Sequence, residues 1–169
     1  MRFKTVKNLH RTLGAAGGAL LISLALPASP ATALDMSWGT VVNLNSNKCL
    51  EVGGWSTADG AGVNQWDCHE GNNQKWLAVP YGGGNLIYNA NSNKCLEVRG
   101  WSTANGAQIV QWECHGGANQ QWRIHNGNYH FALINVNSGK CLEIGGWRDD
   151  NGAPATQWDC HWGENQFWS

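Results

Sequence analysis

The sequence contains few charged residues, and basic residues are scarce after position 33. Charged side chains make up 14% of the 169 residues. Four of the 11 Lys and Arg residues precede position 34 and none of the 12 Asp and Glu residues does, so residues 34–169 carry 7 basic and 12 acidic side chains and a net charge of −5. Nucleic acids and anionic lipids are bound by basic surfaces. We therefore expect a neutral partner, with no nucleic acid and no membrane insertion.

A long hydrophobic run is also missing. The apolar stretch from about Leu13 to Leu26 is diluted by Gly and Ala and is shorter than the roughly 20 residues that a membrane-spanning helix needs. Four basic residues precede it, and Pro27 and the small residues Ala31–Ala33 follow it, an order typical of a signal peptide. We interpret residues 1–33 as the signal peptide of a secreted protein and 34–169 as a single domain, with a membrane anchor as the alternative.

Motifs for common hydrolytic chemistry are absent from the sequence. Glycoside hydrolysis requires two carboxylates about 5 to 10 Å apart. The only adjacent acidic pair, Asp149 and Asp150, stands beside the turn residues Asn151 and Gly152 and is explained as part of a solvated turn. No serine has His and Asp companions in a recognisable motif. The sequence predicts a binding protein that is not an enzyme and has no cofactor.

The six cysteines form none of the close C-x-x-C pairs that zinc sites use. All six lie after residue 33, and an even number of cysteines in an exported chain favours disulfide bonds over a metal site. A constant separation of 19 residues relates Cys49 to Cys68, Cys95 to Cys114, and Cys141 to Cys160. We expect no bound metal.

The rest of the sequence has a period of 46 residues. The block KCLEVGGWSTADGAGVNQWDCHEGNNQKW at 48–76 is identical at 20 of 29 positions to KCLEVRGWSTANGAQIVQWECHGGANQQW at 94–122. It is identical at 18 of 29 positions to KCLEIGGWRDDNGAPATQWDCHWGENQFW at 140–168. The sequence therefore consists of three repeats, at about 39–84, 85–130 and 131–169.

Each repeat predicts four short β-strands. In the first repeat these are residues 41–44, 49–52, 63–68 and 76–79, with Asp59 and Gly60 as a turn. A propeller of three blades would be too small, and a solenoid would need capping repeats. The predicted fold is all-β: a closed β-trefoil with pseudo-threefold symmetry.

Alternation along the strands predicts which side chains share a face. The leucine and valine of C-L-E-V face the core, and Glu51 faces the other way. If Cys49 bonds Cys68, then Asn64 and Trp66 of the later strand join Glu51 on an outward patch. An indole suits the apolar face of a sugar ring, and a carboxylate accepts hydrogen bonds from hydroxyl groups.

The same patch recurs in every repeat and adds a histidine and an asparagine. The candidate sugar-binding residues are Glu51, Asn64, Trp66, His69 and Asn73, then Glu97, Trp112, His115 and Asn119, and then Glu143, Trp158, His161 and Asn165. These residue types together predict up to three sugar sites.

Other repeated residues have different expected roles. The residues expected to be structural are Gln74, Trp76, Gln120, Trp122, Gln166 and Trp168. Parity points Gln65, Gln111 and Gln157 inward, where their amides should bond backbone groups because an unsatisfied amide would cost about 1–3 kcal/mol. Trp55, Trp101 and Trp147 have two possible roles that the sequence leaves open: they cap the core or they widen the pocket. Trp162 either widens the third pocket or covers the end of the last repeat.

Each repeat carries the same four motifs in order: C-L-acid-aliphatic, N/D-G-A, Q-W-acid-C-H and N-Q-x-W. This pattern resembles the ricin-type β-trefoil lectin family, which includes the galactose- and xylan-binding modules of bacterial glycosidases. The resemblance covers essentially all of residues 34–169. It implies one disulfide within each repeat and one sugar pocket per repeat. It also implies that Glu51 takes adjacent hydroxyls, Trp66 stacks on the sugar, and Asn73 and His69 contact it.

Three features depart from that family pattern. All three repeats carry Glu where Asp is usual. The Glu side chain is one methylene longer, which argues against a preference for galactose. The position of Asn64 is Val110 and Thr156 in the other repeats, so the first pocket is expected to be the strongest. The sequence stops just after Trp168, and we expect residues 34–38 to fill part of the place of the last strand.

The predicted function is a secreted carbohydrate-binding protein whose partners are neutral glycans or polysaccharides, with galactose or xylan types as options. The alternative is a β-trefoil protease inhibitor or another protein-binding module. Such inhibitors use one long exposed loop, whereas the repeats here have equal spacing.

Overall fold

The computed structural model describes residues 37–169, which form short strands and single-turn 3-10 helices joined by turns and loops. The signal peptide predicted for 1–33 lies outside these residues. The strands are β1 (Gly39–Thr40), β2 (Cys49–Val52), β3 (Val63–Trp66), β4 (Lys75–Tyr81), β5 (Gly84–Asn89), β6 (Cys95–Val98), β7 (Ala107–Trp112), β8 (Gln121–Asn126), β9 (Phe131–Asn135), β10 (Cys141–Ile144) and β11 (Ala155–Trp158). The 3-10 helices are η1 (Gly53–Trp55), η2 (Asn72–Gln74), η3 (Arg99–Trp101), η4 (Ala118–Gln120), η5 (Gly145–Trp147) and η6 (Glu164–Gln166). Within the described range no helix has the length and apolarity needed to cross a membrane.

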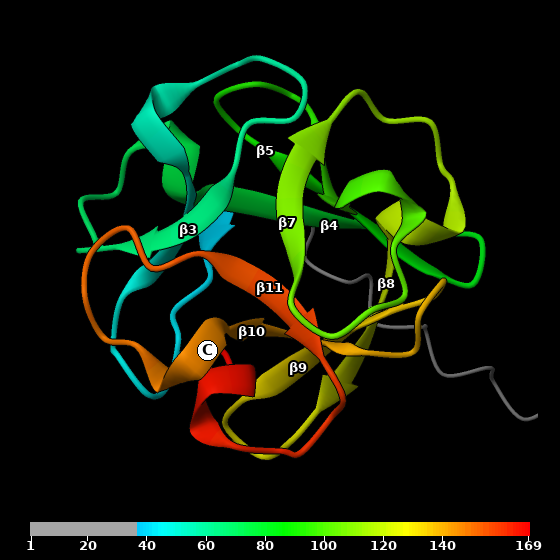
Figure 1. The fold of residues 1–169 in the computed structure, drawn as a ribbon. Helices are drawn as coiled ribbons and strands as arrows, with labels where there is room; N and C mark the ends of the chain where they lie inside the picture. The colour runs from blue at the N-terminus through cyan, green and yellow to red at the C-terminus, as the bar shows by residue number, and fades with distance from the viewer. Residues whose placement is uncertain (1–36) are drawn as a thin grey trace, which may run out of the picture. The chain divides into compact units, whose positions relative to one another are not determined.

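The three repeats lie around a common axis, which confirms the predicted β-trefoil. Each contributes an antiparallel pair: β2 with β3, β6 with β7, and β10 with β11. Strands β3, β7 and β11 meet one another near the centre of Figure 1, where β7 pairs with β11 and single bridges join Gly62 to Val110 and Asn64 to Pro154. The predicted disulfides Cys49–Cys68, Cys95–Cys114 and Cys141–Cys160 each join residues within one repeat.

Residues at the two ends of the described chain pair with each other. Val42 and Ser169 exchange two backbone hydrogen bonds of 2.9 Å, and Trp168 bridges both Asn43 and Phe131. The last residues thus take the place of the fourth strand in the third repeat. Of residues 34–38, only 37 and 38 are described, and β1, which follows them, pairs with β4.

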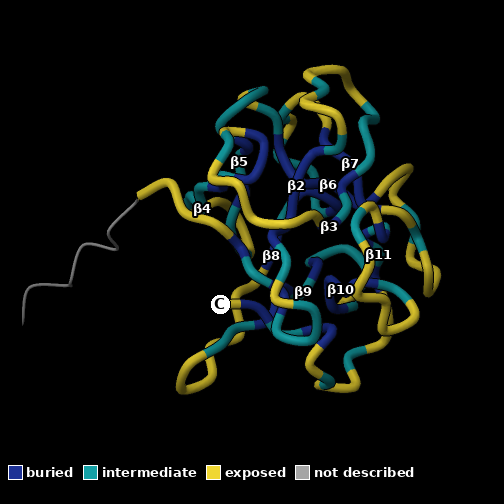
Figure 2. Tube along the Cα trace, turned by 90° about the vertical axis from the view of Figure 1, so that its left-hand side faces the viewer, coloured by how far each residue is buried: buried dark blue, intermediate teal, exposed yellow. Residues whose placement is uncertain are grey.

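The core is formed by the side chains that strand parity turns inward. Leucine and valine or isoleucine of β2, β6 and β10 are fully buried. Three tryptophans join them, because Trp76, Trp122 and Trp168 are only 3%, 0% and 0% exposed. The Nε1–H of each donates to the backbone carbonyl of Leu50, Leu96 or Leu142. Figure 2 shows buried segments inside and exposed loops around them.

The inward-pointing glutamines connect one repeat to another. The Gln65 Nε2 donates to the carbonyls of Arg148 and Asp150, at 3.1 Å each, and its Oε1 accepts from the Ser46 hydroxyl at 2.6 Å. Gln111 and Gln157 make the equivalent contacts. The expected bonds from these amides to backbone are therefore present, and they link neighbouring repeats.

Turn residues of one repeat also bond the strand end of another. The Asp67 backbone N–H donates to Asn151 Oδ1 at 3.0 Å, and Asn151 Nδ2 donates to Asp67 Oδ2 at 2.8 Å. Asn105 and Asp159 form the same pair. These aspartates also accept from a lysine of their own repeat, Lys48 or Lys140. The polar links hold the three repeats in register at the exposed rim.

These contacts predict a loss of stability in acid that depends on the lysines. The Lys48 ammonium, followed by the Asn151 amide, lowers the pKa of Asp67, and Lys140 and Asn105 do the same for Asp159. A carboxyl group whose pKa is lower in the folded protein stabilises the fold at pH values above the ordinary Asp pKa of 3.8. This contribution is lost as the pH falls through the pKa of the folded state. Thermal unfolding from pH 7 to pH 2 should show a constant melting temperature down to about pH 5 and a decline below it.

Replacing both lysines with methionine, K48M/K140M, should reduce the part of this decline that the pairs cause. Lys75, which forms no ion pair within residues 37–169, provides the matched control K75M. Equal acid sensitivity of K48M/K140M and K75M would contradict the assignment.

Candidate functional site

The β2–β3 pair of the first repeat places a carboxylate next to an exposed indole. In the register Cys49 lies opposite Trp66 and Glu51 opposite Asn64, as strand parity predicts. The Trp66 side chain is 42% exposed. Its counterparts Trp112 and Trp158 are 41% and 43% exposed. Each repeat therefore presents one indole on the disulfide side of its hairpin.

The glutamate lies at the floor of a cleft and not on an outward patch, which corrects the expectation from parity. Glu51 is only 5% exposed. Its Oε2 accepts hydrogen bonds from Gln74 Nε2 at 3.1 Å and from Asn73 Nδ2 at 3.3 Å. The residue is buried because η2 folds back over β2 and brings these amides against the carboxylate.

The second carboxylate oxygen, Oε1, accepts none of the hydrogen bonds formed within residues 37–169. Glu51 lines a cleft of about 340 Å³ together with Gly54, Trp55, Trp66 and His69. Glu97 and Glu143 are held in the same way, by Gln120 and Gln166. One oxygen is thus fixed by the protein, and the other is left as an acceptor in the cleft.

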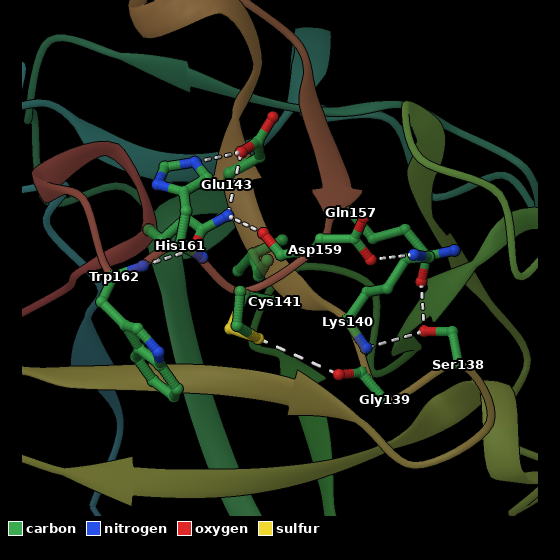
Figure 3. Close-up of a disulfide and its surroundings, with 12 residues drawn as sticks. Ser138, Gly139, Lys140, Cys141, Glu143, Gln157, Asp159, His161 and Trp162 are labelled. Atoms are coloured by element: carbon green, nitrogen blue, oxygen red, sulfur yellow. Dashed lines mark hydrogen bonds and ion pairs between the residues drawn. A yellow bond between two sulfur atoms is a disulfide. The ribbon is translucent and has the colours of Figure 1, made fainter.

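The histidine contacts both the carboxylate and a second indole. His69 Nδ1 accepts from the Gly71 N–H at 3.1 Å, so the neutral ring carries its proton on Nε2. That Nε2 lies 3.4 Å from Glu51 Oε2. The imidazole also stacks on Trp55, with ring centroids 5.7 Å apart. Figure 3 shows the equivalent His161 turned toward Glu143 in the third repeat.

The asparagines predicted to contact a sugar are almost fully buried. Asn73 is 1% exposed, and its Nδ2 donates to the Val52 carbonyl as well as to Glu51. Its Oδ1 is buried and has no partner within the described residues, as is also true of Asn119 and Asn165. Asn165 lines the third cleft. Asn73 and Asn165 hold both the glutamate and the strand end, whereas Asn119 donates, among residues 37–169, only to the Val98 carbonyl, and the contact of these amides with a sugar stays a prediction.

Asn64 lies beside the first cleft but does not line it. Its amide faces Gly53, where a Cβ would come within 2.8 Å of the Asn64 Nδ2, and its Oδ1 is buried without a partner. The third cleft, with Thr156 at this position, has a similar volume of about 320 Å³. A special role of Asn64 in the first pocket therefore remains a prediction.

The tryptophans left undecided by the sequence lie in the clefts. Trp55, Trp101 and Trp147 are 53%, 51% and 52% exposed, so they do not cap the core. Trp55 lines the first cleft and Trp147 the third. The sequence signal for this position was the glycine directly before each tryptophan, because the backbone after the strand takes positive φ at Gly54, Gly100 and Gly146.

Trp162 does not line the third cleft. Its side chain points away from Glu143 in Figure 3, and its ring lies 5.0 Å from that of His125 in β8 and 6.3 Å from that of Phe167. It therefore packs over the last residues of the third repeat. Among the described residues no cluster of three or more His, Cys, Asp or Glu side chains is arranged to hold a metal ion.

Comparison with known proteins shows that the same fold recurs in carbohydrate-related proteins. Residues 37–168 match the family model of the ricin-type beta-trefoil lectin domain. The designed threefold-symmetric protein ThreeFoil is 36% identical, with 78% of this chain and 95% of that chain covered and a TM-score of 0.76. An exo-β-1,3-galactanase from Clostridium thermocellum is 30% identical over 80% of this chain but only 30% of its own, with a TM-score of 0.77.

A ricin B-like lectin from Macrolepiota procera, solved in complex with lactose, is similar in fold. It is 20% identical, with 79% of this chain and 94% of that chain covered and a TM-score of 0.69.

Proposed function

This chain belongs to the ricin-type β-trefoil lectin family, and from that premise we propose that it binds carbohydrate at up to three sites, one per repeat. The observation that carries the proposal is the free Oε1 of a fixed glutamate at the floor of a cleft lined by exposed indoles. A carboxylate oxygen accepts hydroxyl protons, and an indole face covers the C–H groups of a sugar ring. The candidate ligands are neutral glycans or polysaccharides.

Binding at several clefts of one rigid body suits a polysaccharide. A repeating ligand that reaches two clefts gains avidity through effective concentration without new contacts. The three disulfides favour a place of action outside the reducing cytoplasm. We propose an extracellular lectin that carries no catalytic residues of its own.

The carboxylate is the group through which the proposal is tested. In E51Q/E97Q/E143Q the amide oxygen should face the donors of Gln74 and its equivalents, which leaves an NH2 group toward the cleft. The sugar hydroxyls then lose their acceptor, and each site should lose about 1.5–3 kcal/mol, roughly 10- to 100-fold in affinity. Retention on insoluble polysaccharides and titration with soluble sugars measure the loss.

The control for the lost charge is Glu113→Gln, because Glu113 is exposed and its carboxylate accepts no hydrogen bond from residues 37–169. This variant should bind like the parent protein. If the parent protein is retained on no glycan, or if E51Q/E97Q/E143Q binds as tightly as E113Q, the proposed function is wrong.

A further inference from the structure

The second indole of each cleft occupies a costly backbone conformation. Trp55 has φ 56°, and the preceding Gly54 has φ 62°. The left-handed region is unfavourable for a bulky side chain, and such conformations persist where the surrounding structure enforces them. Trp101 and Trp147 repeat the conformation, with φ 57° and 56°. An exposed side chain held this way in three repeats points to a use other than packing.

Two neighbours fix the orientation of this indole. The His69 ring stacks on Trp55 at an interplanar angle of 22°. Gly71 leaves room for both rings, because a Cβ at that position would lie 2.5 Å from Trp55 Cη2 and 2.7 Å from His69 Cε1. Gly117 and Gly163 make the same space for Trp101 and Trp147. The indole and the imidazole form one aromatic wall.

This wall and Trp66 lie at opposite ends of the strand that carries the carboxylate. Trp66 is opposite Cys49, the first residue of β2, whereas Trp55 comes three residues after Val52, the last. Glu51 lies between them, since each strand residue advances about 3.3 Å. Both indoles line the same cleft.

We infer that Trp55, Trp101 and Trp147 determine specificity by making the clefts favour pyranoses whose hydroxyl groups are all equatorial. This inference rests on the proposed function. Such rings, in the gluco and xylo configurations, carry axial C–H groups on both faces and fit between two aromatic walls. A galacto ring has an axial 4-hydroxyl on one face, and burying it against an indole leaves a polar group without a hydrogen bond.

The test compares three sugars in NMR titrations: methyl β-glucoside and methyl β-galactoside, which differ only at carbon 4, and methyl β-xyloside. The parent protein should prefer the glucoside and xyloside over the galactoside by up to about tenfold, the size of one aromatic contact. In W55G/W101G/W147G the preference should fall to near one. Because glycine adopts positive φ freely, this variant should keep or raise the melting temperature.

A second variant keeps the indoles and displaces them. Alanine at Gly71, Gly117 and Gly163 should push each ring off its histidine and reduce the same preference. The exposed Trp38, which lies outside the clefts, gives the control W38G, which should change neither preference nor stability.

The outcomes separate this inference from the proposed function. If the parent protein binds the galactoside as tightly as the glucoside, or if W55G/W101G/W147G keeps the preference, the inference is overturned and the lectin function stands. If none of the three sugars shifts an indole signal while the parent protein is retained on another glycan, the inference is overturned and the lectin function stands. If the parent protein is also retained on no glycan, the proposed function fails and the inference fails with it.

Discussion

Replacing Trp66, Trp112 and Trp158 together with alanine is expected to remove most of the sugar affinity and leave the fold intact. Each indole is 41–43% exposed, and Trp66 and Trp158 line the clefts of the first and third repeats. Truncating an aromatic residue at the centre of a binding site commonly costs about 2 kcal/mol or more, roughly 30-fold per site. Loss at three sites also removes avidity, so retention on a polysaccharide should fall below detection.

The stability cost of this variant should be small. None of these indoles belongs to the core cluster, and each lies near a turn glycine of the neighbouring repeat: a Cβ at Gly60 would lie 3.4 Å from Trp112, and Cβ atoms at Gly106 and Gly152 would lie 3.7 Å from Trp158 and Trp66. Circular dichroism and thermal unfolding would show whether the fold is kept. Trp38→Ala controls for the loss of an exposed indole. A folded triple variant that still binds would place the sugar elsewhere on the molecule.

The second large effect is a loss of stability in Trp122→Ala. Trp122 is fully buried among the core residues, and its Nε1–H donates to the Leu96 carbonyl at 3.0 Å. Removing a buried tryptophan costs about 3–5 kcal/mol, and the unpaired carbonyl adds to this cost. For a domain of this size the melting temperature should fall by about 10–20 °C.

The matched control is Trp112→Ala, which removes the same side chain from an exposed position of the same repeat. Trp112→Ala should lose binding at one site and keep its melting temperature within a few degrees. Trp122→Ala should instead show the large fall in melting temperature. Equal melting temperatures for the two variants would contradict the division of the tryptophans into core and cleft residues.

Strand parity and the repeat explain why much of the fold was predictable from the sequence. A constant 46-residue period placed the three units, and alternation within C-L-E-V identified the buried leucine and valine. The same alternation placed Trp66 opposite Cys49. These features follow from local periodicity, which the sequence displays directly.

The burial of Glu51 was not predictable by the same reasoning. It depends on Gln74, 23 residues away, being folded back by η2 until its amide meets the carboxylate. The role of Trp55 likewise depends on two successive residues with positive φ, a conformation that strand parity does not address. Trp162 remained undecided because its neighbour His125 belongs to another repeat. The burial of Glu51 and the place of Trp162 are decided by contacts between segments far apart in the chain, whereas the place of Trp55 is decided by the local backbone.

The most direct measurement of the central claim uses the 11 tryptophans as reporters, all of which lie within the described residues. Each indole N–H gives its own signal in a nitrogen–proton NMR spectrum, and single replacements assign the signals. With a bound sugar, we predict shifts for the six cleft indoles, namely Trp55, Trp66, Trp101, Trp112, Trp147 and Trp158. The signals of Trp38, Trp76, Trp122, Trp162 and Trp168 should stay in place. Shifts confined to this second group would contradict binding in the clefts.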